Sequence, residues 1–476
     1  MTDYTSKLCT LPNDSPGYQP GDTLTLGDGT KWYYYEQVGW APAAPPQNSP
    51  IFLNPITGLI TDPAQRAAVA EAAGHTLSPN KRSVSRSLSG YMQPFAIGSY
   101  GGRTYRAAIT VPANFVGARL VLRNPSTSDV NWTGPIYFAP SNQPTGNNPS
   151  GSWTQVTFNA GQTTGVIPAG KGDYSAGNCT PGVLVSDWIP VASVARADGS
   201  LNRVLYVSGY ADPAMSSLPN MGNTSQPTTN WADKNDADVA GRTFECRSAS
   251  GSLANSASFD SGGTGAGYGN PFVEVEFLLA EDCTTILGMG DSITNGDGPT
   301  MKMASPVHFA AVTLSNAGKL CVASNHGYSS QKTNTFSARL RSILVNQLCP
   351  DVVVYSAWSP NDFGQAQDKT FAAAQMRENV EVAARLCRQH GVSLVLSTGT
   401  PCNLGAEDSI RVAFNAWVVD FAAKNYVKVV DYSAVVSDPG DPTNLLASLR
   451  TDTIHPNLAG YKAMGAALVT VLNTLL

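Results

Sequence analysis

Two short segments of this chain contain the residue types that nucleophilic catalysis requires. Residues 288–296 carry Ser292 directly after an apolar run, so a buried strand would end at this hydroxyl. Residues 452–457 carry an acid and an imidazole three positions apart, at Asp452 and His455. A serine hydroxyl is a poor nucleophile until a base removes its proton, and an imidazole suits that task near neutral pH. We therefore expect Ser292 to be a nucleophile, His455 its base and Asp452 the group that orients the base.

The elements that must position these residues form an alternating pattern of strands and helices. The apolar strand candidates are 284–290, 319–323, 351–356, 392–397 and 427–431. Strands that are apolar throughout and alternate with helices predict a parallel sheet covered on both faces. Sites in such sheets lie beyond the carboxyl ends of the strands. Because Ser292, Gly327 and Asn361 each follow one of these strands, we expect them to converge on one edge.

Four motifs within residues 283–476 resemble those of the SGNH (GDSL-type) hydrolase family and occur in the family's order. They are Gly290-Asp291-Ser292-Ile293-Thr294, Asn325-His326-Gly327-Tyr328-Ser329, Asn361-Asp362 and Asp452-Thr453-Ile454-His455-Pro456. The resemblance implies an α/β fold with three α/β/α layers, the activity of an esterase, deacetylase or lipase, and no cofactor or metal. It assigns the oxyanion hole to the Ser292 amide, the Gly327 amide and the Asn361 side chain. The family usually has a glycine two residues before the asparagine, where this chain has Ser359-Pro360.

The chain before residue 283 has the patterns of β structure. Residues 1–45 contain Asp28-Gly29 between alternating segments and predict a small N-terminal β unit. Residues 46–95 predict a linker with one short helix at 62–74, followed by a polar connector at 78–89.

Residues 96–282 contain many short strand patterns and predict a β-sandwich-like domain. The alternation of apolar residues with Glu274 and Glu276 predicts a strand with one buried and one solvent-exposed face. The polar tract 213–270 predicts long loops. Four tryptophans of this domain either pack in its core, which we favour, or stack on sugar rings: Trp132, Trp153, Trp188 and Trp231.

Composition excludes several classes of partner. The chain of 476 residues has a formal charge of −5 and no basic block, which argues against nucleic acid. It has no apolar run of the roughly 20 residues that a membrane span requires, and no apolar core behind Lys7 that would make a secretory signal. We therefore expect synthesis in the cytoplasm without membrane insertion.

The eight cysteines form no Cys-x-x-Cys pair. Five lie in or beside apolar segments and are interpreted as reduced core thiols: Cys283, Cys321, Cys349, Cys387 and Cys402. Cys9, Cys179 and Cys246 could be thiols or disulfides.

These observations predict a serine ester hydrolase that acts through an acyl-enzyme. The N-terminal modules favour a large, fixed substrate, and O-acetyl groups of a polysaccharide fit best. The order of modules resembles bacteriophage tail-fibre and tail-spike proteins, which implies a homotrimer attached to a virion through the N-terminal region.

Two other classes stay open. A glycan-binding or structural virion protein with a weak or relict esterase domain would also explain the β-rich N-terminal part. A metal-dependent phosphoesterase could use carboxylates and an imidazole as hard ligands, from Asp291, Asp297, Asp362 and His455.

Overall fold

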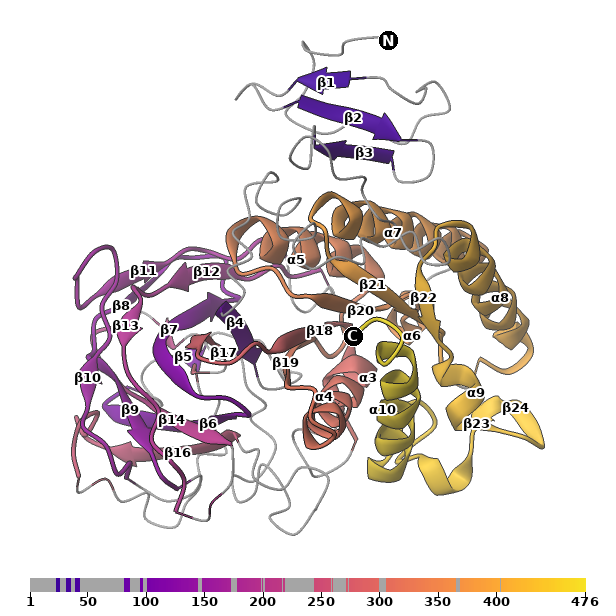
Figure 1. Cartoon of the computed structure of the whole chain (residues 1–476). Coiled ribbons are helices and arrows are strands. Elements are labelled where there is room, and N and C mark those ends of the chain that lie inside the picture. The colour runs from indigo at the N-terminus through magenta and orange to yellow at the C-terminus, as the bar shows by residue number, and fades with distance from the viewer. Residues whose placement is uncertain are drawn as a thin grey trace.

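The fold is taken from a computed structural model of the chain, and element labels follow Figure 1. The structure describes residues 101–143, 148–172, 178–197, 199, 202–215, 217–218, 244–257, 259, 271–272, 274–298, 305–364, 369–402 and 404–476, together with the backbone of five earlier strands. Those strands are β1 Thr23–Thr25, β2 Lys31–Tyr35, β3 Gly39–Pro42, β4 Lys81–Ser85 and β5 Phe95–Ala96.

The first three strands pair antiparallel in the order β1-β2-β3, as the predicted N-terminal β unit requires. The helix expected at residues 62–74 lies outside the described residues.

Two antiparallel sheets follow, and their facing sides share one apolar core. One sheet has the order β10-β9-β14-β6-β16, with bounds Thr154–Gln155, Ile136–Ser141, Arg203–Ala211, Arg103–Val111 and Phe244–Ser250. The other has the order β12-β7-β17-β4, with β12 Gly182–Val185, β7 Phe115–Asn124 and β17 Glu274–Leu279, and with β13 Ile189–Pro190 paired to β7. Small pairs join β8 Val130–Trp132 to β11 Gly165–Ile167 and β5 to β15 Ser217–Leu218. This arrangement supports the predicted sandwich.

Two sequence-based expectations for this region were wrong. The connector at 78–89 contains β4, which pairs with β17 and extends the sandwich to residue 81. Its sequence, Lys-Arg-Ser-Val-Ser, has one aliphatic residue and therefore no strand signal. Within the polar tract 213–270, residues 244–250 form β16, which pairs with β6 along seven residues, so this part of the tract is a strand and not a loop.

The tryptophans of the sandwich lie in different environments. Trp132 is fully buried in the core, and its Nε1 donates to the Gly134 carbonyl at 2.8 Å. Trp153 and Trp188 are half-buried beneath the guanidinium groups of Arg106 and Arg119, at 4.6 and 4.8 Å from the ring centres. Trp231 lies outside the described residues.

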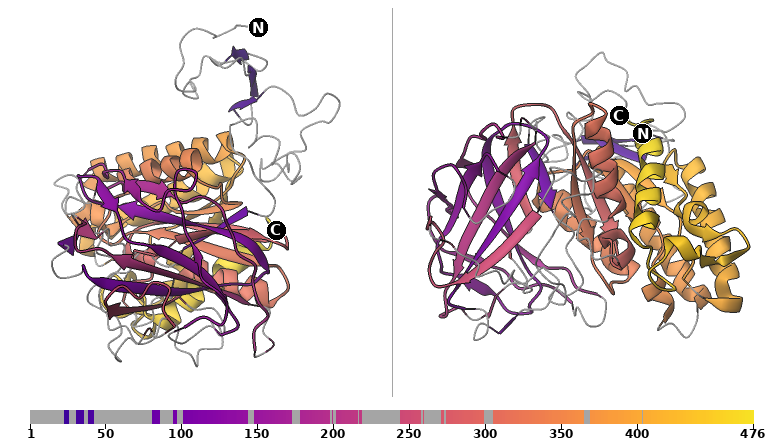
Figure 2. Two further views of the ribbon diagram at one scale, coloured as in Figure 1. Left: turned by 90° about the vertical axis from the view of Figure 1, so that its left-hand side faces the viewer. Right: turned by 90° about the horizontal axis from the view of Figure 1, so that it is seen from below.

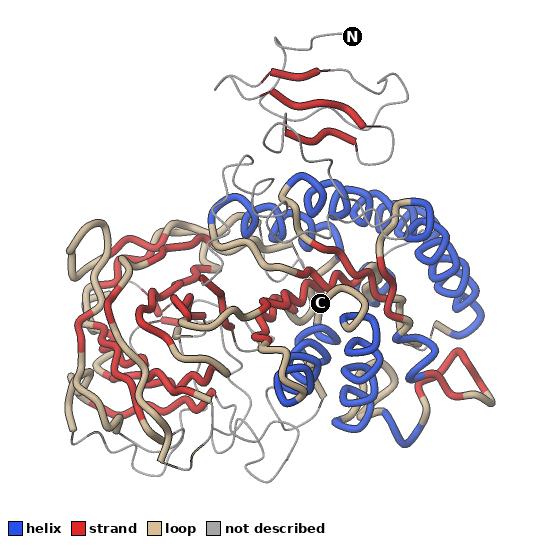
Figure 3. The backbone as a smooth tube through the Cα atoms, viewed as in Figure 1, coloured by secondary structure: helices blue, strands red, loops and turns tan. Residues whose placement is uncertain are grey.

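The C-terminal part is a parallel sheet between two helical layers, as Figures 1 and 3 show. The strand order is β19-β18-β20-β21-β22, with bounds Cys321–Gly327, Thr284–Gly290, Val352–Ser356, Ser393–Ser397 and Lys428–Val430. One face packs against α4 Pro306–Asn316, α9 Tyr432–Val436 and α10 Leu458–Leu472, and the other against α5 Thr333–Asn346, α7 Lys369–Gln389 and α8 Asp408–Lys424. Short elements complete it: α3 Ser292–Asn295, α6 Pro360–Gly364, η1 Gly405–Glu407, η2 Ala447–Leu449, β23 Ser437–Asp438 and β24 Asp441–Leu445. The predicted α/β architecture of this part is confirmed.

The face of β17 that was expected to meet solvent is instead buried. Figure 2 shows that the sandwich lies directly against the α/β part of the chain. Glu274 and Glu276 are 1% and 0% exposed. Arg123 of β7 forms an ion pair with Glu274, with Arg123 Nη2 at 2.6 Å from Glu274 Oε2. The same Nη2 donates to Oε1 of Gln347, the residue after α5, at 2.9 Å. Glu276 pairs with Arg119 and accepts from the Leu348 N–H at 3.3 Å. The alternation therefore predicted the strand correctly, but the polar face of β17 contacts the C-terminal domain and not solvent.

The charge state of this interface follows from the buried ion pair. Burial raises the pKa of Glu274, but Arg123 more than offsets that effect, and the pKa is lowered to about 2. Burial and Arg123 together lower the pKa of His326, which lies 3.7 Å from Glu274, to about 4. At neutral pH the glutamate is therefore charged and the histidine neutral.

Six described cysteines are buried free thiols: Cys179, Cys283, Cys321, Cys349, Cys387 and Cys402. The prediction for the five core thiols is confirmed, and Cys179 joins them. The side chains of Cys9 and Cys246 lie outside the described residues. No helix in the described part of the chain is long and apolar enough to cross a bilayer.

Replacing Arg123 with methionine should strongly destabilise the protein, because the Glu274 charge would stay buried without its counterion. Losing one partner of such a pair typically costs about 3–5 kcal/mol. The double variant Arg123→Met, Glu274→Met should lose much less. Urea unfolding at neutral pH measures both, and equal losses for the single and double variants would contradict this account of the interface.

Candidate active site

Ser292 is the first residue of the short helix α3, immediately beyond β18. Asp291 caps the helix, because its Oδ1 accepts a hydrogen bond from the Ile293 N–H at 3.0 Å. A Cβ at Gly290 would lie 2.0 Å from Thr294 Oγ1, so the turn from strand to helix needs a glycine there. The local sequence thus fixes where the hydroxyl of Ser292 is presented.

Asp291 is fully buried and braces this turn. Burial raises its pKa, although the hydrogen bond from Ser359 opposes the effect. Ser359 Oγ lies 2.5 Å from Asp291 Oδ2, which connects the nucleophile turn to the loop after β20. These contacts show that Asp291 braces the turn that carries the nucleophile.

The three residues expected to act together are joined by hydrogen bonds. His455 Nε2 lies 2.9 Å from Ser292 Oγ, and His455 Nδ1 lies 2.8 Å from Asp452 Oδ2. If Nδ1 carries the proton toward the carboxylate, Nε2 is free to accept the serine proton. The structure therefore brings a nucleophile, a base and an orienting acid into contact across 163 positions of the chain.

The loop that carries Asp452 and His455 is held by its own backbone. Asp452 Oδ1 accepts from the His455 and Ile454 amides at 2.6 and 2.7 Å. Partial burial raises the pKa of Asp452, but the hydrogen bonds from the His455 ring and these amides outweigh it, so the pKa is lowered. The Thr451 N–H donates to the His455 carbonyl at 2.9 Å, and α10 begins three residues after the histidine. The carboxylate stays ionised and fixed in direction.

Two of the three expected oxyanion donors are occupied in this structure. The Gly327 N–H donates to Asn325 Oδ1 at 2.8 Å, so this amide is not available to substrate. A Cβ at Gly327 would lie 2.2 Å from the Asn295 amide nitrogen, which means that the glycine is needed for packing against α3. Asn361 Nδ2 lies 3.0 Å from the Gln331 carbonyl and 3.2 Å from Ser359 Oγ. Asn361 would have to release one of these partners to bind an oxyanion.

The backbone amides of Ser292 and Ser330 make no hydrogen bond among the described residues. Ser330 was not expected to matter. It is the third residue of a turn closed by the Gln331 N–H and the Tyr328 carbonyl at 3.2 Å, and its φ is 63°. Glycine usually fills such a position, so a serine there stores backbone strain. The sequence gives no sign of this strained conformation, because a serine in a polar loop is compatible with many ordinary backbone conformations.

The residues considered for a metal site do not gather. Asp291 faces Ser359, Asp297 Oδ1 accepts from Asn295 Nδ2 at 2.6 Å, and Asp362 faces Thr333. Within the part of the chain that the structure describes, no three His, Cys, Asp or Glu side chains are grouped to hold a metal ion. The four candidate ligands therefore have separate roles.

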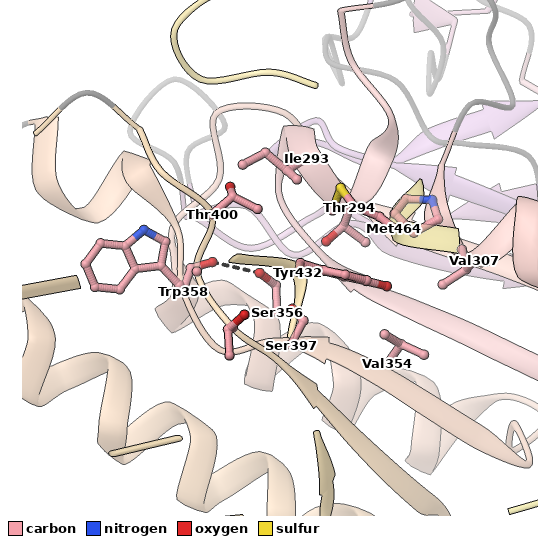
Figure 4. Close-up of a pocket in the computed structure, with 13 residues that line it drawn as sticks. Ile293, Thr294, Val307, Val354, Ser356, Trp358, Ser397, Thr400, Tyr432 and Met464 are labelled. Atoms are coloured by element: carbon pink, nitrogen blue, oxygen red, sulfur yellow. Dashed lines mark hydrogen bonds between the residues drawn. The ribbon is translucent and has the colours of Figure 1, made fainter. Parts of the chain in front are cut away.

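A pocket lies beside the nucleophile helix (Figure 4). It encloses about 420 Å³, part of it open to solvent, and Ile293 and Thr294 form one wall. Thr400 and Tyr432 also line it, and among the described residues their buried hydroxyls make no hydrogen bond. Buried polar atoms of this kind usually take a water or a ligand group as partner. The pocket has room for a small polar group, and Ser292 and His455 are not among the residues that line it.

Asp362 of α6 caps the start of another helix. Its Oδ2 accepts from the Thr333 N–H of α5 at 3.0 Å, and Lys332, the residue before α5, makes no side-chain cap of its own. Burial raises the pKa of Asp362 to about 6, although the hydrogen bonds from Thr333 oppose the shift.

This raised pKa predicts a pH-dependent stability. A carboxyl whose pKa rises on folding favours the folded state while protonated, and the contribution is lost as the pH rises through the folded pKa. The Asp362→Asn variant lacks this titration. Its free energy of unfolding, relative to that of the unmodified protein, should improve by about 2–3 kcal/mol between pH of about 4 and about 7. Denaturation curves at several pH values measure the difference, and parallel pH profiles would contradict it.

Residues 289–463 match the GDSL-like Lipase/Acylhydrolase family, a span that contains all four motifs. No curated protein sequence matches the chain.

Several solved structures are similar to the C-terminal part. A GDSL-like lipase from Bacteroides thetaiotaomicron is 20% identical, with 40% of this chain and 89% of its own covered and a TM-score of 0.33. A member of the lipolytic protein G-D-S-L family from Veillonella parvula is 18% identical, with 40% and 99% covered and a TM-score of 0.32. An acetyl-xylooligosaccharide esterase from Geobacillus is 18% identical, with 40% and 94% covered and a TM-score of 0.33. The family match assigns the C-terminal part of the chain to the GDSL-like lipase/acylhydrolases.

Proposed function

We propose that this protein hydrolyses carboxylic esters through an acyl-enzyme formed on Ser292. The observation that carries the proposal is the continuous path from Ser292 Oγ to His455 Nε2 at 2.9 Å and from His455 Nδ1 to Asp452 Oδ2 at 2.8 Å. This arrangement can activate a hydroxyl that is otherwise unreactive.

The reaction proceeds in two steps. Ser292 Oγ bonds to the ester carbonyl carbon while its proton moves to His455 Nε2; the bond to the alcohol oxygen then breaks, and Nε2 returns the proton to that oxygen. In the second step a water oxygen attacks the acyl carbon and gives a proton to Nε2. The acyl–Oγ bond breaks, Ser292 regains the proton, and the acid leaves. Asp452 stabilises the positive imidazole in both steps.

The negative oxygen of each tetrahedral intermediate needs hydrogen-bond donors. The amides of Ser292 itself and of Ser330, in the loop after β19, make no hydrogen bond among the described residues, and they take the roles that we propose for the oxyanion hole. Asn361 joins them when its side chain leaves either the Gln331 carbonyl or Ser359 Oγ. Ser330 thus replaces Gly327, whose amide is bound to Asn325.

We propose O-acetyl groups on a polysaccharide as the substrate. The side chains of His455 and Asp452 are 23% and 52% exposed, so an ester on a bulky polymer can reach the base from solvent. Attachment to a virion and trimer formation stay predictions that rest on the N-terminal β unit and the order of modules.

Replacing Ser292 with alanine should abolish acetate release from p-nitrophenyl acetate and from acetylated glycans. We expect a loss of at least about 10³-fold, because the remaining groups cannot form an acyl-enzyme. The circular dichroism spectrum should be unchanged, since the hydroxyl contributes no cap to α3. Unchanged turnover would eliminate the mechanism.

Replacing Asp452 with asparagine should lower kcat by about 10²- to 10⁴-fold, because an amide neither stabilises the imidazolium nor selects the required tautomer. A matched control is Asp420→Asn, which removes an equally exposed carboxylate that pairs with Lys424 at 2.7 Å on α8. Steady-state kinetics should show a normal kcat for the control. Equal kcat values for the two variants would remove Asp452 from the mechanism.

A further inference from the structure

Gln331 is a fully buried side chain at the junction of the two domains. It lies between β19 and α5, in the loop that contains Ser330. Its Oε1 accepts a hydrogen bond from the N–H of Cys179 at 3.0 Å. Cys179 belongs to the sandwich and precedes β12, so this bond crosses from one domain to the other.

The main chain of the same residue holds the loop after β20. The Gln331 carbonyl accepts from Asn361 Nδ2 at 3.0 Å and lies 3.3 Å from Ser359 Oγ. Ser359 Oγ is closer to Asp291 Oδ2, at 2.5 Å, so its single proton serves the carboxylate. Asp291 in turn caps the helix that begins with Ser292. One residue therefore connects the sandwich with both the asparagine loop and the nucleophile turn.

The physical consequence is an added restraint on loops that are also held within the C-terminal part, for example by the bond from Asn325 Nδ2 to the Thr294 carbonyl at 3.0 Å. The Cys179 amide is buried, so it would lose its acceptor at a cost if Gln331 moved away. That cost restrains the Gln331 backbone, and the restrained carbonyl restrains Asn361. An active site depends steeply on such restraint, since misplacement by about 1 Å can slow a reaction about 100-fold.

We propose that Gln331 is a positioning residue through which the β-sandwich sets the geometry of the Ser292 and Asn361 loops. The inference rests on the ester hydrolase function proposed above. It assigns the sandwich a part in catalysis that is separate from any binding of substrate.

The chain offers a matched control at the same interface. Gln347 is also a buried glutamine of the C-terminal domain, and its Oε1 also accepts from the sandwich, from Arg123 Nη2 at 2.9 Å. It lies at the end of α5, where its own N–H donates to the Ile343 carbonyl at 3.0 Å. It makes no contact with the catalytic loops among the described residues.

The test compares Gln331→Met with Gln347→Met in the full chain. Both substitutions keep side-chain length and remove one acceptor, so both should lower the melting temperature by similar amounts. Only Gln331→Met should lower kcat on p-nitrophenyl acetate, by roughly 10- to 100-fold, with little change in KM. Gln331→Glu, which keeps an acceptor for the Cys179 amide, should recover part of that loss.

Hydrogen exchange supplies a readout that does not need activity. Gln331→Met should speed amide exchange in residues 291–296 and 359–364, and Gln347→Met should not. If Gln331→Met does not fold, Gln331→Asn replaces it against Gln347→Asn, because asparagine stays polar but is too short to reach the Cys179 amide. Equal exchange in these segments for the paired variants, or equal kcat values, would overturn the proposal. Absence of ester turnover in the unmodified protein would instead refute the proposed function, and the exchange result would still decide the role of Gln331.

Discussion

The turn from β18 into α3 is the constraint on which the site depends. Gly290 has no room for a Cβ, and the buried carboxylate of Asp291 takes the Ile293 N–H, so the helix can begin only at Ser292. The same carboxylate receives the Ser359 hydroxyl, which brings the asparagine loop to the serine. On the opposite side the His455 loop is held by its own aspartate. Every proposed catalytic group is thus placed relative to one short, capped turn.

The charged interface between the domains extends this constraint beyond the α/β fold. Glu274 and Arg123 are both nearly inaccessible, and such a pair is stable only while the two surfaces stay in contact. Gln331 joins the sandwich to the catalytic loops through the buried hydrogen bond from the Cys179 N–H. The sandwich therefore stabilises the hydrolase part and, in our proposal, also tunes its geometry. This gives the two domains a reason to act as one unit even before substrate is considered.

The sequence allowed prediction of the parallel sheet, because its strands are continuous apolar runs, and of the serine, histidine and aspartate, because motif spacing restricts where they can meet. Prediction from the sequence failed where one residue pattern is compatible with two different environments. Glu274 and Glu276 alternate like a solvent face, and no local signal tells solvent from another domain. The sequence of β4 is too polar for a strand to be predicted there. The family resemblance implied that the Gly327 amide binds the oxyanion, whereas this amide donates to Asn325, the small size of the glycine serves packing, and the strained residue of that loop is Ser330.

The central claim is that Ser292 is a nucleophile activated by His455. Its most direct measurement is the intact mass of the protein after incubation with a serine-directed phosphonate, followed by peptide mapping. The account predicts one adduct per chain, on Ser292, and none on a His455→Ala variant over the same time. A protein that stays unlabelled, or carries the adduct on another residue, would contradict it.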